Sequence, residues 1–301
     1  MKILLLGKDG QVGWELQRAL ALLGELRACA RNDADFTDPE SLRRLVRMEA
    51  PDVIVNAAAY TAVDKAEGDR STAHAVNAAA PGVLAEEAVA CGAWLVHYST
   101  DYVFDGSKEG AWVETDTANP LSVYGRSKYE GEEKIRASGA HHLILRTSWV
   151  FATRGGNFAR TMLRLAKERD ALDVVADQHG APTGAELLAD ATALALHRIA
   201  ALGADGRGLS GTYHLAASGS TTWHAYARHV LVLAQQHGAL LKAEPEEVRA
   251  IASSAFPTPA MRPANSRLDC SKFCKNFGLV LPDWRHHVGR LIAELAAQGN
   301  L

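Results

Sequence analysis

The sequence lacks the features that define several large classes of protein. Its four cysteines include no Cys-x-x-Cys pair, so we expect free thiols in a reducing cytoplasm. No apolar run reaches the ~18 residues of a membrane helix, and no signal-peptide cleavage site follows the short apolar N-terminus. A net charge of −3 offers no basic surface for nucleic acid. The twelve histidines show no His-x-x-His or His-x-x-x-His metal motif.

What remains is the composition of an ordinary globular protein. The chain has 301 residues, of which 48% are hydrophobic and 22% are charged. That length suggests about two domains with ample core.

The first segment predicts a dinucleotide-binding unit. Residues 2–6 form a continuous apolar run, typical of a strand buried on both faces. Gly7, Gly10 and Gly13 follow, before a predicted helix over 14–23. Glycines at this place allow a tight turn and a close approach of the backbone to a pyrophosphate, and the helix N-terminus faces the anion.

The end of the next predicted strand, 25–30, bears on the choice of coenzyme. In such units an acid there binds the ribose 2′-hydroxyl of NADH, whereas a basic residue accepts the 2′-phosphate of NADPH. The strand ends at Ala30 and Arg31 follows. We therefore hypothesise that NADPH is at least as acceptable as NADH; the alternative is that Arg31 is merely solvated.

Two later segments carry acid–base chemistry. A predicted strand from residue 93 ends in Ser99, Thr100 and Asp101, where active sites of open parallel sheets lie. A predicted helix after Pro120 carries Tyr124-x-x-x-Lys128, which places phenol and ammonium on one face. A nearby ammonium lowers the pKa of a phenol and suits it to exchange a proton with a carbonyl oxygen. Taken singly, each motif also has a non-functional interpretation: residues 99–101 as an ordinary turn, and Tyr124-x-x-x-Lys128 as part of an exposed helix.

Together these motifs resemble the extended short-chain dehydrogenase/reductase family. The resemblance rests on the glycine triplet, on residues 56–59 (Asn-Ala-Ala-Ala), on 99–105 and on Tyr124-x-x-x-Lys128. Further segments narrow it to the branch that reduces dTDP-linked 4-keto sugars, and they span the chain: 7–16, 60–67, 146–150, 157–166, 177–184 and 257–268.

The resemblance implies an α/β fold, a Rossmann-type doubly wound parallel sheet with a smaller C-terminal substrate-binding lobe. Residues 1–150 would form the NAD(P)-binding domain and 151–301 mainly the lobe, with segments near 171–216 returning to the first domain. The helices and strands expected in the second half include helices over 157–168, 186–201, 223–237 and 284–297.

The implied activity is reduction of the 4-keto group of dTDP-6-deoxy-L-lyxo-4-hexulose to dTDP-L-rhamnose by NADPH or NADH. This is the last step of dTDP-rhamnose synthesis, which supplies bacterial surface polysaccharide such as the O-antigen of lipopolysaccharide. Tyr124 would donate the proton, Lys128 would hold the cofactor ribose and lower the Tyr124 pKa, and Thr100 would polarise the carbonyl. A cytoplasmic homodimer, with no nucleic-acid or membrane partner, is expected.

The implied binding residues fall into three sets. The cofactor would be lined by Gly7, Gly10, Gln11, Val12, Gly13, Arg31, Asp35, Phe36, Ala59, Tyr60, Thr61, Tyr98, Tyr124 and Lys128. The sugar nucleotide would meet Thr100, Asp101, Trp149, Arg262 and Arg267. The two arginines are chosen because guanidinium groups bind a pyrophosphate in a bidentate manner; the alternative is that each pairs with a surface acid.

A divalent ion such as Mg²⁺ is described near a dimer interface in some relatives. Its counterparts here would be Glu15, Glu186 and Asp190, since hard cations prefer carboxylate oxygens. Solvated surface acids are the alternative reading.

Two departures from the family pattern and two rival functions stay open. Ala30 and Arg31 stand where close relatives carry an acid, and Tyr60 stands where a histidine is common. One rival is a sugar-nucleotide reductase of another kind, an epimerase or a dehydratase, for which the acid beside Thr100 is suitable. The other is a non-catalytic, reductase-like regulatory subunit.

Overall fold

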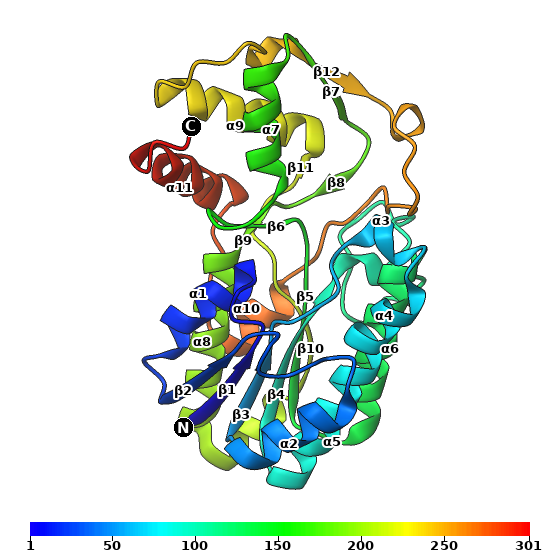
Figure 1. The fold of residues 1–301 in the computed structure, drawn as a ribbon, viewed down its shortest axis with the longest axis vertical. Coiled ribbons are helices and arrows are strands. Elements are labelled where there is room, and N and C mark those ends of the chain that lie inside the picture. Colours follow the sequence, from blue (N-terminus) through cyan, green and yellow to red (C-terminus); the bar gives the residue numbers. More distant parts are fainter.

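The fold consists of a large α/β part and a smaller lobe above it (Figure 1). It is described here from a computed structural model of residues 1–301. The large part is built on a six-stranded sheet in the order β10-β5-β4-β3-β1-β2, and every strand pair in it is parallel. Its strands are β1 (Lys2–Leu6), β2 (Glu25–Cys29), β3 (Val53–Asn56), β4 (Trp94–Thr100), β5 (His142–Thr147) and β10 (Gly211–His214).

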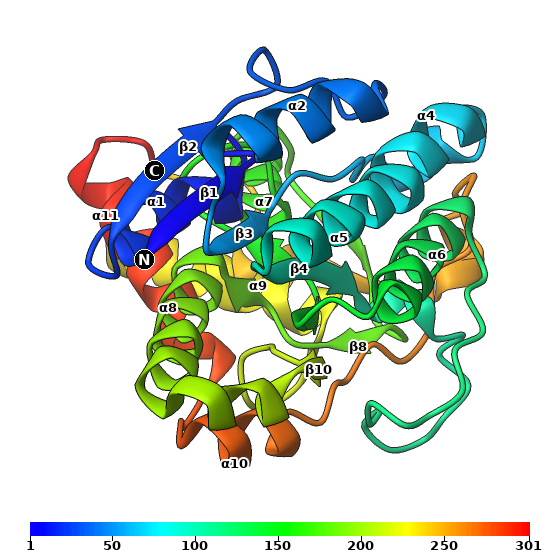
Figure 2. The same ribbon diagram turned by 90° about the horizontal axis from the view of Figure 1, so that it is seen from below.

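Helices cover both faces of this sheet (Figure 2). On one face lie α1 (Gln11–Leu20) and α8 (Ala185–Leu202), and on the other lie α2 (Pro39–Glu49), α5 (Ala80–Cys91) and α6 (Val123–Ser138). Side chains along a strand alternate between faces: Ile3 and Leu5 join one buried cluster, whereas Leu4 and Leu6 join the other. The expected doubly wound α/β fold is therefore confirmed.

The smaller lobe packs helices α7 (Phe158–Glu168), α9 (Trp223–Gln236) and α11 (Trp284–Ala297) around short strand pairs. The pairs are β7 (Leu172–Val175) with β12 (Val248–Ile251), β8 (His179–Gly180) with β11 (Thr221–Thr222), and β6 (Val150–Phe151) with β9 (Thr183–Gly184). Helix α10 (Ser271–Phe277) returns beside β10. One buried cluster runs from the sheet into the lobe, so the two parts share a core.

Local structure refines the sequence-based expectation after β1. Helix α1 begins at Gln11 rather than at residue 14, because Gly10 has the extended conformation of an N-cap (φ −73°, ψ 168°). Between β3 and β4 the chain forms α4 (Arg70–His74), a π-helix (Ala75–Ala79) and α5. The glycine-rich segment Gly203–Leu209 forms a 3₁₀ turn.

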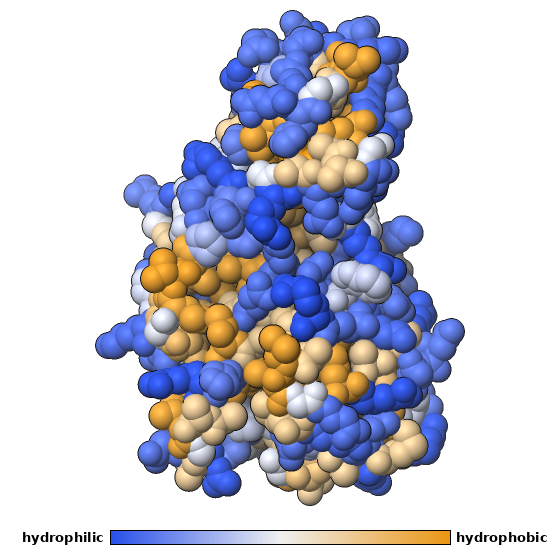
Figure 3. Space-filling model, turned by 90° about the vertical axis from the view of Figure 1, so that its left-hand side faces the viewer, coloured by the Kyte–Doolittle hydropathy of each residue, from blue (hydrophilic) through white to orange (hydrophobic).

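The face that carries α1 and α8 is rich in apolar side chains (Figure 3). Trp14 and Leu194, on these two helices, are 45% and 51% exposed. The segment Ala185–Leu209 is long and apolar enough to cross a membrane, but half of it is buried. In this fold it is a core helix that packs on α1.

Candidate active site

The glycine turn after β1 has the shape of a pyrophosphate cradle. Gly7 has a positive φ of 85°, and a Cβ there would lie 2.7 Å from the Ala58 nitrogen. A Cβ on Gly13 would lie 2.0 Å from the Gly7 oxygen, so both positions require glycine. No side chain caps α1, which leaves its first backbone N–H groups, including those of Gln11 and Val12, available to an anion. The turn therefore fits a dinucleotide.

The end of β4 and the start of α6 meet at the carboxyl edge of the sheet. A 3₁₀ turn (Asp101–Val103) follows β4, and its Tyr102 N–H donates to the Thr100 hydroxyl at 3.2 Å. Ser122 caps α6 by accepting from the Gly125 N–H at 3.1 Å. A Cβ on Gly125 would lie 2.3 Å from the Tyr102 oxygen, so glycine lets the first turn of α6 contact this edge.

This close packing brings Tyr124 beside Thr100 and Asp101. Its ring lies edge-on to Tyr102, with centroids 5.6 Å apart. Burial raises the pKa of Tyr124 to about 12, against a lowering contribution from the Thr100 hydroxyl. Burial also raises the pKa of Asp101 to about 6, and its Oδ2 has no hydrogen-bond partner. The edge thus gathers a phenol, a hydroxyl and a carboxyl group.

Lys128 lies one turn further along α6, and its side chain is almost fully buried (2% exposed). Its Nζ donates to the Tyr98 carbonyl oxygen at 2.6 Å and lies 3.1 Å from His97 Nε2. Burial lowers the pKa of Lys128 to about 8, although the charge of Glu132 acts in the opposite direction.

The raised pKa of Tyr124 is opposite in direction to the sequence-based expectation. Lys128 is not among the groups that shift the pKa of Tyr124, because its amine faces β4 rather than the phenol. The spacing of four does place both residues on one helix face, but the Lys128 amine binds β4 instead of the phenol.

Tyr60 joins the same site from the loop after β3. It packs with Tyr124 on a small cluster of Ala66, Ala73 and Val123. Asn77, in the π-helix, accepts from the Tyr60 N–H at 2.9 Å and donates to its carbonyl oxygen at 3.0 Å. A π-helix is uncommon and frequently marks a functional site. Ala59 and Thr61 flank Tyr60 in this loop.

The remaining candidate cofactor residues lie at the ends of β2 and β4. Asp35 accepts from the backbone and hydroxyl of Thr37 at 2.8 and 2.7 Å, and these bonds lower its pKa. Phe36 packs on the buried cluster beneath α2, and Arg31 is exposed. The Tyr98 hydroxyl pairs with Thr192 of α8 at 2.7 Å, so only its carbonyl, not its ring, faces the Lys128 side of the sheet.

Trp149 follows β5 with a strained backbone, since its φ is 49° and such values are uncommon for residues other than glycine. Its ring stacks on Trp223 with centroids 3.5 Å apart and 13° between planes. A Cβ on Gly180 would lie 2.6 Å from the Trp149 ring. The stack is partly exposed and stands between the sheet and the lobe.

The two arginines proposed for the pyrophosphate are already engaged. Arg262 makes a bidentate ion pair with Asp64, with Nη1 and Nη2 at 3.1 and 2.7 Å from the two oxygens. Arg267 donates to Asn265 Oδ1 at 2.8 Å and to the Glu109 carbonyl. Arg262 contacts the Tyr102 phenol and so belongs to the site, whereas Arg267 ties its loop to the segment around Glu109.

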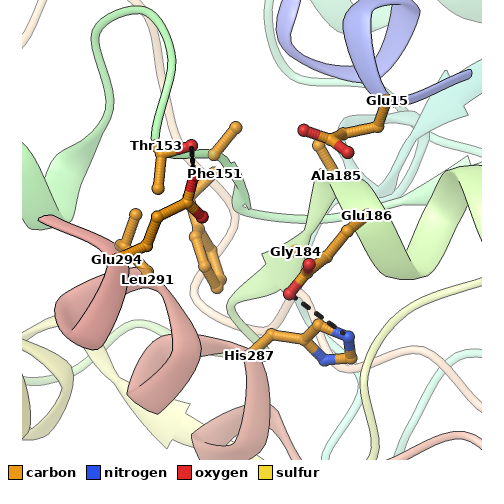
Figure 4. A pocket seen from close by; sticks show the side chains of 10 residues that line it. Glu15, Phe151, Thr153, Gly184, Ala185, Glu186, His287, Leu291 and Glu294 are labelled. Atoms are coloured by element: carbon orange, nitrogen blue, oxygen red, sulfur yellow. Dashed lines mark hydrogen bonds and ion pairs between the residues drawn. The ribbon is translucent and has the colours of Figure 1, made fainter. Parts of the chain in front are cut away.

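The three acids proposed for a metal are not assembled in this chain. Glu15 and Glu186 line one cavity with Glu294 (Figure 4). Asp190 instead pairs with Arg18 at 2.8 Å, and Glu186 pairs with Arg290 at 3.0 Å. No group of three or more His, Cys, Asp or Glu residues is placed to hold a metal ion. A Mg²⁺ site formed by these three acids within one chain is therefore not supported.

Sequence reasoning missed His97 and Glu132, both fully buried. Each contacts or faces Lys128: His97 through the 3.1 Å approach to Nζ, Glu132 from the next turn of α6. A signal for Glu132 was present, because 124, 128 and 132 continue the period of four. His97 has only a weak signal, a lone polar residue within an apolar strand.

Comparison with known proteins agrees with this geometry. A family model described as "RmlD substrate binding domain" matches residues 1–297. The dTDP-4-dehydrorhamnose reductase of Shigella flexneri is 53% identical over 299 residues, which cover 98% of each chain. The crystal structure of dTDP-4-dehydrorhamnose reductase from Bacillus anthracis in complex with NADP superposes with a TM-score of 0.86 at 31% identity. That match covers 98% of this chain and 100% of the other.

A second solved structure, a dTDP-4-dehydrorhamnose reductase from Clostridium acetobutylicum, has a TM-score of 0.87 at 34% identity. It covers 98% of this chain and 99% of its own. The fold and the edge that gathers Tyr124, Lys128 and Thr100 define a nicotinamide-dependent oxidoreductase of the extended short-chain dehydrogenase/reductase type. Within that class, the chain belongs to the RmlD family, the family of the dTDP-4-dehydrorhamnose reductases.

Proposed function

We propose that the protein reduces the 4-keto group of dTDP-6-deoxy-L-lyxo-4-hexulose to give dTDP-L-rhamnose. The observation that carries this proposal is Tyr124 beside Thr100 at one sheet edge, with buried Lys128 one helical turn further on and bonded to β4. The glycine turn shaped for a pyrophosphate lies after β1 of the same sheet. The full-length identity with reductases of this activity supports the substrate.

A bound NADPH or NADH supplies the hydride that adds to the keto carbon. Tyr124, whose phenol is protonated at neutral pH, donates the proton to the carbonyl oxygen. Burial raises its pKa and makes it a weaker acid in the free enzyme, so its role as donor rests on its position beside Thr100. The Thr100 hydroxyl orients the carbonyl oxygen toward the phenol. Lys128 presents its amine to the coenzyme ribose, held from behind by the Tyr98 carbonyl.

For the sugar nucleotide, Trp149 supplies an apolar wall for the deoxy sugar and Arg262 supplies positive charge beside Tyr102. The Arg262–Asp64 pair joins the proline-rich segment to the loop after β3. Its exposed fractions of 25% and 40% leave it accessible to a competing pyrophosphate.

For the coenzyme, exposed Arg31 just beyond β2 favours acceptance of NADPH, because a basic side chain there can pair with a 2′-phosphate. The acid at this end of β2, Asp33, accepts from the Ala30 N–H at 2.6 Å and pairs with Arg27. The NADP complex of the Bacillus anthracis relative is in line with this assignment.

The decisive experiment mixes purified protein with dTDP-6-deoxy-L-lyxo-4-hexulose and NADPH and follows the loss of reduced-nicotinamide absorbance. Tyr124→Phe is the test variant and Tyr129→Phe, on the same helix, is the matched control. We expect Tyr124→Phe to lower kcat about 10²–10⁴-fold, the usual contribution of a positioned proton donor, and Tyr129→Phe to leave it near wild type. An unchanged kcat in Tyr124→Phe would remove the proposed donor.

A wild-type enzyme that binds NADPH but leaves this substrate unreduced would instead favour another sugar nucleotide or the regulatory-subunit alternative. The two alternatives are separated by a panel of other dTDP- and UDP-linked keto sugars.

We further infer a cytoplasmic homodimer whose product supplies rhamnose to bacterial surface polysaccharide. Free thiols are in line with a reducing compartment, and the apolar face over α1 and α8 (Figure 3) supports self-association. Sedimentation velocity of Trp14→Glu against wild type tests the dimer: a variant that remains dimeric would exclude this face.

A further inference from the structure

His97 is a fully buried histidine that the proposed reaction leaves without a role. It lies on β4 opposite Asn56 of β3 in the parallel register. Val96 and Tyr98, its neighbours in sequence, face α8, so His97 points to the other face, toward α6. There its ring stands directly behind the Lys128 amine.

Contacts from β4 account for two of the three hydrogens that a charged Lys128 amine carries. One is donated to the Tyr98 carbonyl at 2.6 Å, and a second faces His97 Nε2 at 3.1 Å. Because the substituents of the nitrogen are tetrahedral, fixing two hydrogens fixes the direction of the third. That third hydrogen is left for the coenzyme.

The other side of the His97 ring is also paired. Its Nδ1 lies 3.1 Å from Asn56 Nδ2, and Asn56 Oδ1 accepts from the Ala58 N–H at 3.1 Å. Burial, together with the charge of Lys128, holds the pKa of His97 well below its ordinary value, so the ring is neutral. A neutral imidazole has one donor nitrogen and one acceptor nitrogen.

These partners link the charge of Lys128 to Ala58. When Lys128 is neutral, His97 Nε2–H donates to the Lys128 amine and His97 Nδ1 accepts from Asn56 Nδ2. The Asn56 side chain then keeps its observed orientation, with Oδ1 accepting from the Ala58 N–H. When Lys128 is charged, Nε2 must accept, and Nδ1–H then needs the oxygen of the Asn56 amide. Turning that amide releases the Ala58 N–H, which abuts the glycine turn at Gly7.

We propose that His97 is a positioning residue for coenzyme binding: with Asn56 it holds the Lys128 amine and couples its protonation to release of the Ala58 N–H. The coupling rests on the proposed function, since the role of Lys128 toward the coenzyme comes from it. Its consequence is that coenzyme binding draws a proton onto Lys128.

The charged and titratable groups around Lys128 agree with a proton exchange near neutral to alkaline pH. His97 faces the amine from β4, and Tyr124 and Glu132 lie on its own helix. Arg146 of β5 acts only through Glu132, to which it is paired at 2.6 Å. Since the pKa of Lys128 is lowered to about 8 by burial, part of the population is neutral at pH 8.

Calorimetric titration of the enzyme with NADPH alone, at pH 8 in two buffers of different ionisation enthalpy, tests the coupling. We expect wild type to take up a fraction of a proton. His97→Leu should weaken NADPH binding about tenfold, as expected for one charge-assisted hydrogen bond, and should change the proton uptake from its wild-type value. His97→Gln, whose carboxamide offers an acceptor in place of Nε2, should restore part of both.

His214→Leu is the matched control. His214 is another fully buried histidine of the same sheet, on β10, with its Nδ1 at 3.0 Å from the Trp112 carbonyl oxygen. It makes no contact with Lys128, so its loss perturbs the sheet without reaching the amine. We expect unchanged NADPH affinity and unchanged proton uptake in this variant.

In turnover, the alkaline limb of the pH profile of kcat should move down by about one pH unit in His97→Leu, because a buried ammonium without an acceptor loses its proton more readily. The KM for the sugar nucleotide should stay unchanged. The proposal would be overturned if His97→Leu had the same melting temperature as His214→Leu and also kept the wild-type NADPH affinity, proton uptake and alkaline limb of kcat.

A wild-type measurement covers the case in which His97→Leu does not fold. In protein labelled with ¹⁵N-histidine, we expect the neutral His97 ring to change tautomer on addition of NADPH at pH 8. A single fixed tautomer with and without NADPH would overturn the coupling. None of the binding readouts uses the sugar nucleotide, so they stand apart from failure of the proposed reaction.

Discussion

Replacing Glu132 by glutamine tests how far the buried charges beneath the active site hold the fold. Glu132 is fully buried, and its two oxygens accept from Arg146 Nε and Nη2 at 2.9 and 2.6 Å. Ser99 donates to it at 2.5 Å and Arg136 at 3.0 Å. The substitution keeps the shape of the side chain but removes its charge.

The expected cost follows from what is left behind. Arg146 is only 3% exposed, and its Nη1 already lacks a partner, so the variant would contain a buried guanidinium without a counter-charge. Removing one partner of a buried ion pair costs roughly 3–5 kcal/mol. We therefore expect Glu132→Gln to lower the free energy of unfolding by about that amount.

Glu133→Gln is the matched control, one residue along the same helix. Glu133 also pairs with Arg136, but its side chain is 54% exposed, and exposed pairs contribute about 0–1 kcal/mol. Urea unfolding followed by tryptophan fluorescence measures both variants. Equal costs within about 0.5 kcal/mol would refute the argument from burial, because the two changes share their chemistry and helix.

The pH dependence supplies a second check on Glu132. Burial by itself would raise its pKa, but the hydrogen bonds and charges of Arg146, Ser99 and Arg136 hold it below the ordinary value of 4.5. A depressed carboxylate pKa stabilises the fold above the unfolded pKa, and this contribution is lost as pH falls through the folded pKa. The gap between wild type and Glu132→Gln should therefore be full at pH 7 and shrink below about pH 4.5. A gap that grows on acidification would contradict this sign.

Two further predictions concern the glycine of α6 and the coenzyme. Gly131→Ala places a Cβ 2.2 Å from the Asn77 carbonyl oxygen. Because a backbone atom must move, we expect the free energy of unfolding to fall by about 1–3 kcal/mol and the activity to fall as well. Gly156→Ala, whose Cβ would stand in open space, should be neutral in the same unfolding assay. Arg31→Ala should lower kcat/KM for NADPH about tenfold relative to NADH, equivalent to about 1.4 kcal/mol, and exposed Arg44→Ala should not; an unchanged coenzyme ratio would show that Arg31 is only solvated.

Much of the fold could be predicted because its signals are local. Several buried parallel strands are apolar runs, and helix α2 has a start signal within its own residues: Asp38 accepts from the Glu40 N–H as the cap, and Pro39 stands in the first turn. The glycine turn and the Tyr124–Lys128 spacing are likewise read from a few neighbouring residues. Short-range patterns of this kind fix an element before its tertiary contacts are known.

The rest of the site depends on pairs that lie far apart in sequence. Arg262 and Asp64 are separated by 198 residues, so composition around Arg262 could not reveal that an acid already engages it. His97 reaches Asn56 only through the register of β4 on β3. The direction of the Tyr124 pKa was also missed, because burial at the packed edge outweighs a charge that turns toward the strand.

One face of helix α6 holds both the proposed catalytic residues and the buried carboxylate that stabilises the fold. Tyr124, Lys128 and Glu132 follow at intervals of four residues, from the open edge to the interior. A buried ammonium is tolerated at Lys128 because Glu132 raises its pKa against burial, and Glu132 stays ionised because Arg146 holds it. Glu132→Gln should therefore act twice, on unfolding and on the alkaline limb of kcat, which should move to lower pH as Lys128 loses its proton more readily. Glu133→Gln should cost at most about 1 kcal/mol and leave the alkaline limb in place, because its carboxylate is exposed. A stability loss in Glu132→Gln without a shift of the limb would separate the two roles of this helix face.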